Sequence, residues 1–531
     1  MMTILSKVGM SVTRQSVSTS LKGLTEDALR EVRLAVLEHP WFLVYDNINF
    51  PNKKYDQRTG NTDSFENGTT ATVVIAERPV NMKDGRNSYE LLSVKDLAIN
   101  EVDWLHFVCV SDFQFAEVLR RHFKTYKRFS NPVRPKEVLK TKKTEKELRA
   151  RDVSRYARLE WAVPVMQLFH LQMLLCNTIL RNHYGSITTP GSLAFFASML
   201  ERKRVHPDRP DYHAMEELLR HVFDAMVIRV WEVLLGTENL DTFGKRLNNV
   251  DIKKIMSLTL PVIRTMFMKS AMELQQTYGP ANVNAGLFFR DMILFIELSD
   301  AIKVGDIGRI EDVLKWLTIM FQAGMTKNYA NELLHLQCGL RHGWSAETRQ
   351  AIMASWLINT KGKEDSWIPT DLHQEHNNLL TKTIHSAKGS NASWEMLAES
   401  ISTNIHVFSK VAQQLETAFG VTPNCTQHTT VSPETDIMRI VRSLRQHNIL
   451  GHDPRPQALD DVPLVRDLYA EGFMKLSHGR LTSFIQSNMN RQRLAEEDSM
   501  EVEEGLEVEE GMEVDEIDET GIEQYVEASL G

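Results

Sequence analysis

WFLVYDNINF, residues 41–50, is the stretch from which the fold is most readily inferred, with Pro40 before it and Pro51 after it. A run so dense in aromatic and branched residues, bounded by prolines, predicts a buried β-strand. Asp46 follows five bulky apolar residues in this run, so we expect its carboxylate at the end of the strand, where a metal ion or a hydrogen-bond donor can meet it. The alternative is that Asp46 caps the turn that follows.

Other strands are predicted on either side of an ambiguous region. Residues 69–76, TTATVVIA, are rich in β-branched residues and predict a second strand after a polar loop. Residues 159–170 predict a third strand that leads into a helix over residues 171–182. Between them, residues 107–110 suit a strand, whereas Phe115, Leu119 and Phe123 at four-residue steps favour a helix over residues 102–129.

Helical spacing dominates the rest of the chain. Residues 13–24 and 25–39 each predict a helix, and the alternative for the first is part of a helix-turn-helix with Gly9 in its turn. Beyond residue 184, apolar residues recur every three or four positions, and Gly236 and Gly324 mark helix ends. The helices expected there span residues 215–235, 307–322, 391–419, one that opens at Asn328 and one that is capped by Asp371.

These elements predict an α+β, predominantly α-helical fold: a small, incomplete sheet followed by a large helical domain and a disordered acidic tail. The expected divisions are a helical lead-in over 1–40, an α/β region over 41–185, a helical domain over 186–420, a helical extension over 421–494 and the tail over 495–531. The tail repeats acidic hexads such as MEVEEG and cannot bury enough surface to offset its ordering entropy.

Composition points to an intracellular protein without a membrane span. The chain of 531 residues is 42% hydrophobic and 25% charged, as expected for a soluble globular protein of two or three cores. Its 4 cysteines form no CxxC pair, which argues against a disulfide framework or zinc ribbon and suits a reducing compartment. No apolar run is long and pure enough for a signal peptide or a membrane helix.

The net charge of −9 hides a basic segment. From Glu496 onward there are 16 acidic residues and no Lys or Arg, so the remainder has 61 basic against 54 acidic residues. Residues 120–151 hold 13 Lys or Arg against 3 Glu. This segment predicts contact with DNA or RNA, with a solvated linker as the alternative. The candidate nucleic-acid-binding residues are Lys140, Lys142, Lys143 and Lys146.

Two carboxylates are candidates for chemistry. Asp46 is the first; Glu332 is the second, because it borders the apolar face of its helix and needs a metal, an Arg or a backbone donor as partner. Asp306 precedes a helix and is explained as its N-cap. His170 is expected as a hydrogen-bonded core residue, and His373, Glu375 and His376 fit no zinc signature. The chain has no P-loop, GxGxxG or GxSxG motif.

Six ordered blocks resemble one protein family. They read YDNINF at 45–50, PVMQLFHLQMLL at 164–175, GDIGRIEDVLKW at 305–316, NYANELLHL at 328–336, DLHQEHNNLLTK at 371–382 and KGSNASW at 388–394. The chain is thus similar to a fungal family of unknown function, number 6589, over roughly residues 4–420. That family looks like a derivative of RNase H-like transposases.

The resemblance implies a two-metal nuclease site with one part missing. In such enzymes an Asp on the first strand, an Asp on a middle strand and a Glu on a late helix hold two Mg²⁺ ions at a phosphodiester. Asp46 matches the first, and Glu332 is our choice for the last. Relatives carry Gly-Asp-Gln-Leu-Thr before the block that here reads LEWAVPV, whereas this chain has the basic run 136–151 and no such motif. The nearest acid, Asp152, follows that run in a polar, helix-like context.

The sequence therefore predicts a transposase-derived, nucleic-acid-associated, nuclear protein that has lost nuclease activity. An intact acidic site would hold Mg²⁺ at Asp46 and Glu332, and we expect these residues to converge with His170 on one side of the sheet. The alternative is a helical protein-interaction scaffold with no role in nucleic-acid binding. Which of these holds depends on where the basic segment lies relative to Asp46.

Overall fold

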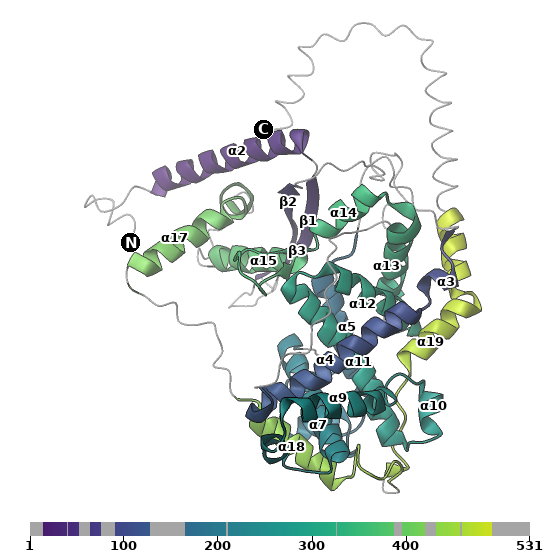
Figure 1. The fold of residues 1–531 in the computed structure, drawn as a ribbon. Coiled ribbons are helices and arrows are strands. Elements are labelled where there is room, and N and C mark those ends of the chain that lie inside the picture. Colours follow the sequence, from purple (N-terminus) through teal and green to yellow (C-terminus); the bar gives the residue numbers. More distant parts are fainter. Residues whose placement is uncertain are drawn as a thin grey trace, which may run out of the picture.

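The computed structural model is predominantly helical with a small β component, which confirms the predicted α+β class (Figure 1). It describes residues 14–39, 41–52, 64–75, 91–127, 165–208, 211–324, 327–386, 396–418, 420, 432–456 and 459–490. Within these ranges, no helix is both long and apolar enough to cross a membrane.

The predicted strand at residues 41–50 is confirmed, but Asp46 lies in its middle and not at its end. Strand β1 (Trp41–Asn52) pairs antiparallel with β2 (Ser64–Ile75), and Asp46 lies opposite Thr70. The prediction was wrong because the apolar run ends at Asp46 while the alternation of faces continues to Ile48, which is 1% exposed. In the described residues the only other strands are β3 (Leu357–Ile358) and β4 (Ile368–Pro369).

The hairpin is buried on one face only. Val44 and Ile48 point into the protein and are almost fully buried. Trp41, Leu43 and Tyr45, which alternate with them, are 39–45% exposed. The apolar run therefore covers both faces of a two-stranded sheet, and the outer face keeps large apolar side chains in contact with solvent.

Most of the core is formed by long helices. Helices α7 (Tyr212–Leu235) and α11 (Pro280–Val304) are buried along most of their length, and α12 (Ile307–Met320) packs on α11. The other elements are α3 (Val94–Leu97), α4 (Glu101–His122), η3 (Lys124–Tyr126), α5 (Leu168–His183), α6 (Leu193–Met199), α8 (Leu240–Lys245), α9 (Asn249–Arg264), α10 (Ala271–Gln275), η4 (Phe321–Ala323), α13 (Lys327–Cys338), η5 (Gly339–Gly343) and α14 (Ala346–Ala354).

Several helix ends follow the sequence signals. The Asp306 carboxylate accepts the Arg309 amide at 3.3 Å, which confirms Asp306 as the N-cap of α12. Gly305, just before it, ends α11 with a φ of 75°, and a Cβ there would lie 2.8 Å from the Trp367 indole. Gly236 likewise ends α7 with a left-handed φ. Positive φ and close packing both explain why a glycine occupies position 305.

Three predictions were wrong in extent or type, and one ambiguous region is settled. Residues 14–38 form one helix, α2 (Arg14–Glu38), and not two helices. The ambiguous region is the helix α4, as its four-residue spacing favoured. The part of the predicted strand at 159–170 that is described is coil at 165–167 and helix from Leu168, so His170 lies in the first turn of α5. The predicted helix at 391–419 contains π-helix η7 (Leu397–Ser402) and a separate α17 (Ile405–Ala418).

The hairpin belongs to a layer that combines the start of the described chain with elements between residues 370 and 418. Figure 1 shows α2, β1, β2, α15 (Thr370–Ser386) and α17 together on one side of the molecule, beyond the helical body. Strand β1 packs on α15, and α2 packs on η7. A small apolar cluster of Ile48, Leu397 and Ile401 lies between them. Polar contacts therefore supply much of the remaining attachment.

The C-terminal elements close the body. Helix α18 (Glu434–Gln446) packs on α7, and α19 (Leu468–Lys475) packs on α12 and η4, followed by η9 (Leu476–Arg480). Asp152, the four candidate lysines and the acidic tail lie outside the described residues.

Candidate functional site

Asp46 faces helix α15 across the inner side of the hairpin. The Asn378 side chain donates a hydrogen bond from Nδ2 to Asp46 Oδ2 at 2.8 Å. The hydroxyl of Thr70 donates to Asn378 Oδ1, and Gln374 Nε2 donates to Thr70 at 2.9 Å. Thr72 donates to Gln374 in turn. Asn378 and Gln374 are 1% and 3% exposed, so these bonds form a buried polar contact between the hairpin and one face of α15.

Asp371, in the first turn of α15, holds the start of α5. Its carboxylate accepts the backbone amides of Phe169 at 3.1 Å and His170 at 3.2 Å. It also forms a 3.0 Å hydrogen bond with His170 Nδ1. The first amides of a helix have no hydrogen-bond partner within the helix, so a carboxylate there accepts their hydrogen bonds. The positive end of the helix dipole also stabilises the negative charge of the carboxylate. Asp371 was predicted as the cap of its own helix; its carboxylate serves the neighbouring helix.

Glu375 completes a group of side chains that we call the Asp46 cluster: Asp46, His170, Asp371, Glu375 and Asn378. The Glu375 side chain hydrogen-bonds to Asp46, and its Oε1 lies 3.7 Å from His170 Nε2. Burial and the neighbouring Asp46 raise the pKa of Glu375 above its ordinary value of 4.5. A hydrogen bond between two carboxyl groups requires a proton, so protonation of Glu375 strengthens this contact.

His170 balances the negative charge of the cluster. Its hydrogen bond to Asp371 is the largest influence on its pKa, which lies above the ordinary value of 6.5; Asp46 and Glu375 act in the same direction. The side chain is 39% exposed. Since the imidazole contacts acids through both nitrogens, the cluster favours its protonated form.

Glu332 lies at the margin of this group. It is half-buried on α13, and together with Asp371 it raises the pKa of Tyr329, for which burial is the main cause. Asp46 lies close enough to His170 to raise the pKa of its imidazole. Glu332 and Asp371 both act on the pKa of Tyr329, which places Glu332 near the Asp371 side of the cluster. The helix carboxylate that hydrogen-bonds to Asp46 is Glu375, from a later helix than the one we chose.

The cluster is arranged for hydrogen bonding and proton exchange. In the described part of the chain, no three His, Cys, Asp or Glu residues are placed to hold one metal ion. The Asn378 amide occupies a lone pair of Asp46 Oδ2, and the hydrogen bond to Glu375 engages the same carboxylate. Cation binding by Asp46 would have to displace its contacts with Asn378 and Glu375.

Sequence reasoning missed the face of α15 that carries these residues. Asp371 and Glu375, and also Gln374 and Asn378, are four residues apart, which places each pair on one side of a helix. A polar face of this kind is typical of solvent exposure. Only the contact with β2, where Thr70 and Thr72 alternate inward, shows that it is buried.

The two arginines at the described start of the basic segment are already paired. Arg120 lies 2.9 Å from Glu117, and Arg121 lies 2.9 Å from Asp224, which also bonds to His122. These cations complete the last turn of α4 and its contact with α7. Any surface for phosphates must therefore use other residues of the segment.

A family of unknown function (DUF6589) matches residues 141–428. The chain belongs to this family. The match includes α5, α13 and α15, which carry His170, Glu332, Asp371, Glu375 and Asn378, whereas Asp46 and the hairpin precede it. The DUF6589 region therefore supplies the helices on which an N-terminal hairpin docks. The chain has no match among curated proteins and none among solved structures.

Proposed function

We propose that this DUF6589 protein is a fungal, transposase-derived, nucleic-acid-associated nuclear protein that binds DNA or RNA without cleaving it. The observation that carries the proposal is the pairing of Asp46, from the first strand, with Glu375, from a late helix. The resemblance described above implies one acid from each of these two positions. We therefore assign the late-helix position to Glu375 in place of Glu332.

The loss of cleavage is inferred from the acids that are present. A two-metal site needs a carboxylate from a middle strand to share the second ion, and the sequence lacks the motif that supplies it. The two remaining acids bond to each other, with Asn378 on one side. Loss of one metal ligand removes transition-state stabilisation on the order of a thousandfold in rate.

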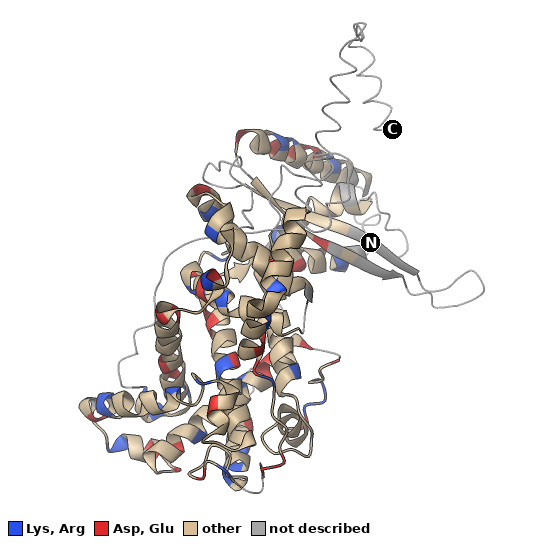
Figure 2. Ribbon diagram, turned by 90° about the vertical axis from the view of Figure 1, so that its right-hand side faces the viewer, with Lys and Arg blue, Asp and Glu red and all other residues tan. Residues whose placement is uncertain are grey.

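Nucleic-acid binding is assigned to the basic segment and not to the helical body. In Figure 2 the Lys and Arg residues of the described helices are interspersed with Asp and Glu. Arg120 and Arg121 are engaged by acids. Lys140, Lys142, Lys143 and Lys146 lie in a stretch with excess positive charge, which suits contacts with phosphates that do not depend on base sequence.

Binding is tested by measuring affinity against salt concentration for a DNA and an RNA duplex of mixed sequence. Replacing the four lysines by Gln removes up to four phosphate contacts, so the slope of log K against log salt falls by up to about 0.9 per contact. A matched control replaces four surface cations of the helical body, Lys253, Lys254, Lys361 and Lys363, by Gln. An unchanged slope in the first variant, or an equal loss in the control, contradicts the assignment.

Cleavage is tested with a Mg²⁺- or Mn²⁺-dependent nicking assay on the parent, Asp46→Ala and Glu375→Gln. We expect no cleavage by any of them and retained binding by all three. Cleavage by the parent that disappears in Asp46→Ala would refute the proposal, because another acid would then complete the site. Cleavage that survives in both variants would place a nuclease elsewhere.

A scaffold function is the second candidate, and the exposed apolar residues of the N-terminal layer favour it. Leu34 and Leu37 on α2 are 56% and 83% exposed, and Leu43 and Tyr45 on β1 are 41% and 45% exposed. Patches of this kind mark interaction sites. Two results together would favour the scaffold function. The parent would show no affinity for nucleic acid, and the double variant Leu34→Ser/Leu37→Ser would lose self-association or partner binding.

A further inference from the structure

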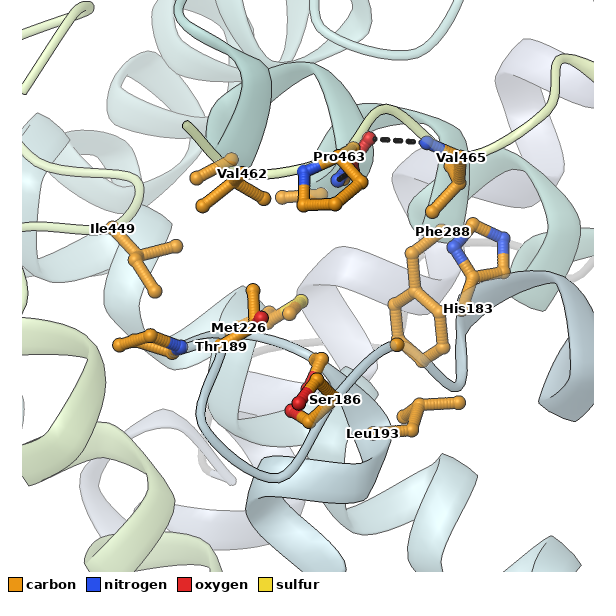
Figure 3. A pocket seen from close by; sticks show the side chains of 17 residues that line it. His183, Ser186, Thr189, Leu193, Met226, Phe288, Ile449, Val462, Pro463 and Val465 are labelled. Carbon is orange, nitrogen blue, oxygen red and sulfur yellow. Dashed lines mark hydrogen bonds between the residues drawn. The ribbon is translucent and has the colours of Figure 1, made fainter. Parts of the chain in front are cut away.

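A cavity of about 200 Å³ lies in the helical body, away from the hairpin (Figure 3). Its floor is formed by α7 and α11, with Met226 and Phe288. The loop between α5 and α6 forms one wall, and the segment 462–465 before α19 forms the other. Ser186 and Pro463, at the two edges, are exposed, so the cavity opens between this loop and this segment.

The walls are held in place by specific hydrogen bonds. Asn284 donates from Nδ2 to the Pro463 carbonyl at 2.9 Å and accepts the Val465 amide at 2.9 Å, the second of which is drawn in Figure 3. On the other side, Ser192 donates from its hydroxyl to the Ser186 carbonyl at 2.7 Å. The opening is therefore framed by two fixed segments, and the site is largely preformed.

His183 is the ionisable side chain of a lining whose other polar members are Ser186, Thr189, Ser192 and Asn284. Its Nε2 is 2.8 Å from Asp291 Oδ2, and the two side chains are 4% and 1% exposed. A carboxylate is only an acceptor, so Nε2 carries the proton and, in the neutral ring, Nδ1 is an acceptor. Within the described residues Nδ1 has no hydrogen-bond partner.

Packing alone does not explain this pair. The second oxygen of Asp291 is buried without a hydrogen bond and lies 3.9 Å from Nε of Arg290, whose Nη2 donates to Asp467. Apolar residues of similar volume would fill this space without burying a charge and would be neutral or stabilising. What the pair does provide is a fixed orientation of the His183 ring at the cavity. The ring lies beside Phe288, with 5.3 Å between the ring centroids.

We propose that this cavity is a binding site for a single-ring aromatic compound that carries one hydroxyl, a small phenol. An apolar cavity of about 150 Å³ already holds a benzene molecule, so about 200 Å³ accommodates such a ring with a substituent. The ring contacts Met226, Phe288 and Val465, and its hydroxyl donates to His183 Nδ1. Asp291 fixes the tautomer that accepts this hydrogen bond.

The test uses phenol and its methyl isostere toluene as probes of the full-length protein, by titration calorimetry. We expect saturable binding of both in the millimolar range or tighter, and phenol to bind about fivefold to tenfold more tightly because of the hydrogen bond. His183→Gln keeps a donor for Asp291 through its amide nitrogen but has no counterpart of Nδ1. It should therefore lower the phenol-to-toluene affinity ratio to about one.

A second variant fills the cavity from its opening. Val462→Phe, at a half-buried position, should abolish the binding of both compounds, whereas Leu464→Phe, at an exposed position outside the lining, should not. Circular dichroism checks the fold of each variant, and if His183→Gln does not fold, the parent ratio and Val462→Phe decide. Three outcomes would each overturn the proposal: no saturable binding of phenol by the parent, equal affinities of the parent for phenol and toluene, or binding that survives Val462→Phe.

Discussion

The helical body is held together mainly by apolar packing, whereas the N-terminal hairpin is held on α15 mainly by polar contacts. In the body, Trp231, Phe289 and Leu314 are fully buried, and charged side chains inside it are paired. The hairpin rests on α15 through Asp46, Thr70 and Asn378, with Ile48 as its main apolar contact, while its outer face is exposed. The body should therefore unfold as one cooperative unit, and the hairpin should open at a lower free energy.

The largest expected effect is on the buried ion pair of Glu297 and Arg309. Arg309 donates to Glu297 at 2.5 and 2.6 Å, and both side chains are at most 3% exposed. Arg309→Met removes the two-point partner of the buried Glu297 carboxylate, leaves it with His106 at 3.6 Å, and should lower the free energy of unfolding by about 3–5 kcal/mol. Urea unfolding measures this. The double variant with Glu297→Leu should recover at least half of the loss; no recovery would mean that packing, not charge, dominates.

A smaller and local effect is expected at Asn378. Asn378→Ala removes the donor to Asp46 and the acceptor for Thr70, which should cost about 1–3 kcal/mol of hairpin docking. Hydrogen exchange should quicken for the β1 amides and stay unchanged for those of α11. Leu379→Ala, at the adjacent and 65% exposed position, is the matched control. Equal changes in β1 and α11 would show that hairpin and body open together.

The hairpin should also be held more tightly at acidic pH. The folded pKa of Glu375 is raised by burial and by Asp46, so its stabilising contribution is complete below pH 4.5 and is lost as pH rises through the folded value. The pKa of His170 is raised mainly by its hydrogen bond to Asp371, which stays beside it in the body, and also by Asp46 of the hairpin. The contribution of Asp46 and His170 to docking is complete below pH 6.5 and is lost as pH rises through the folded value. Protection of the β1 amides, corrected for intrinsic exchange, should therefore fall in two steps.

Two variants separate these steps. Glu375→Gln should remove the lower step, because its side chain does not titrate. His170→Asn keeps a donor for Asp371 in place of Nδ1 and should remove only the upper step. A profile that rises with pH in the parent would mean that the carboxylates stabilise docking in their ionised forms.

The smallest expected effect is on an exposed ion pair of the hairpin layer. Arg30 and Asp27 on α2 are 2.6 Å apart but 68% and 61% exposed. Arg30→Ala should change stability by less than about 0.5 kcal/mol, and less still in high salt. A loss comparable to that of Arg309→Met would end the distinction between the two regions.

The same distinction explains what the sequence could predict. Helices α7 and α12 could be predicted from the spacing of their apolar residues and from local caps such as Asp306. This works because the faces that these helices bury are mostly apolar. The two strands of the hairpin were predicted from their aromatic and branched residues, although their pairing was not. The partner of the hairpin was not predicted either, because Gln374 and Asn378 have the composition of an exposed face and depend on a strand about 300 residues away. The position of Asp46 within β1 was missed for the same reason, since polar residues after it also pair in the sheet.

The separation between Asp46 and Asn378 also has a consequence during protein synthesis. The two residues are 332 positions apart, and the hairpin leaves the ribosome long before the helix on which it docks. At about 5–20 residues per second, this interval lasts roughly 15–70 s. Throughout it Val44 and Ile48 are uncovered together with Trp41, Leu43 and Tyr45. The nascent hairpin thus exposes apolar side chains on both of its faces until α15 has been synthesised, and it can dock only after that point.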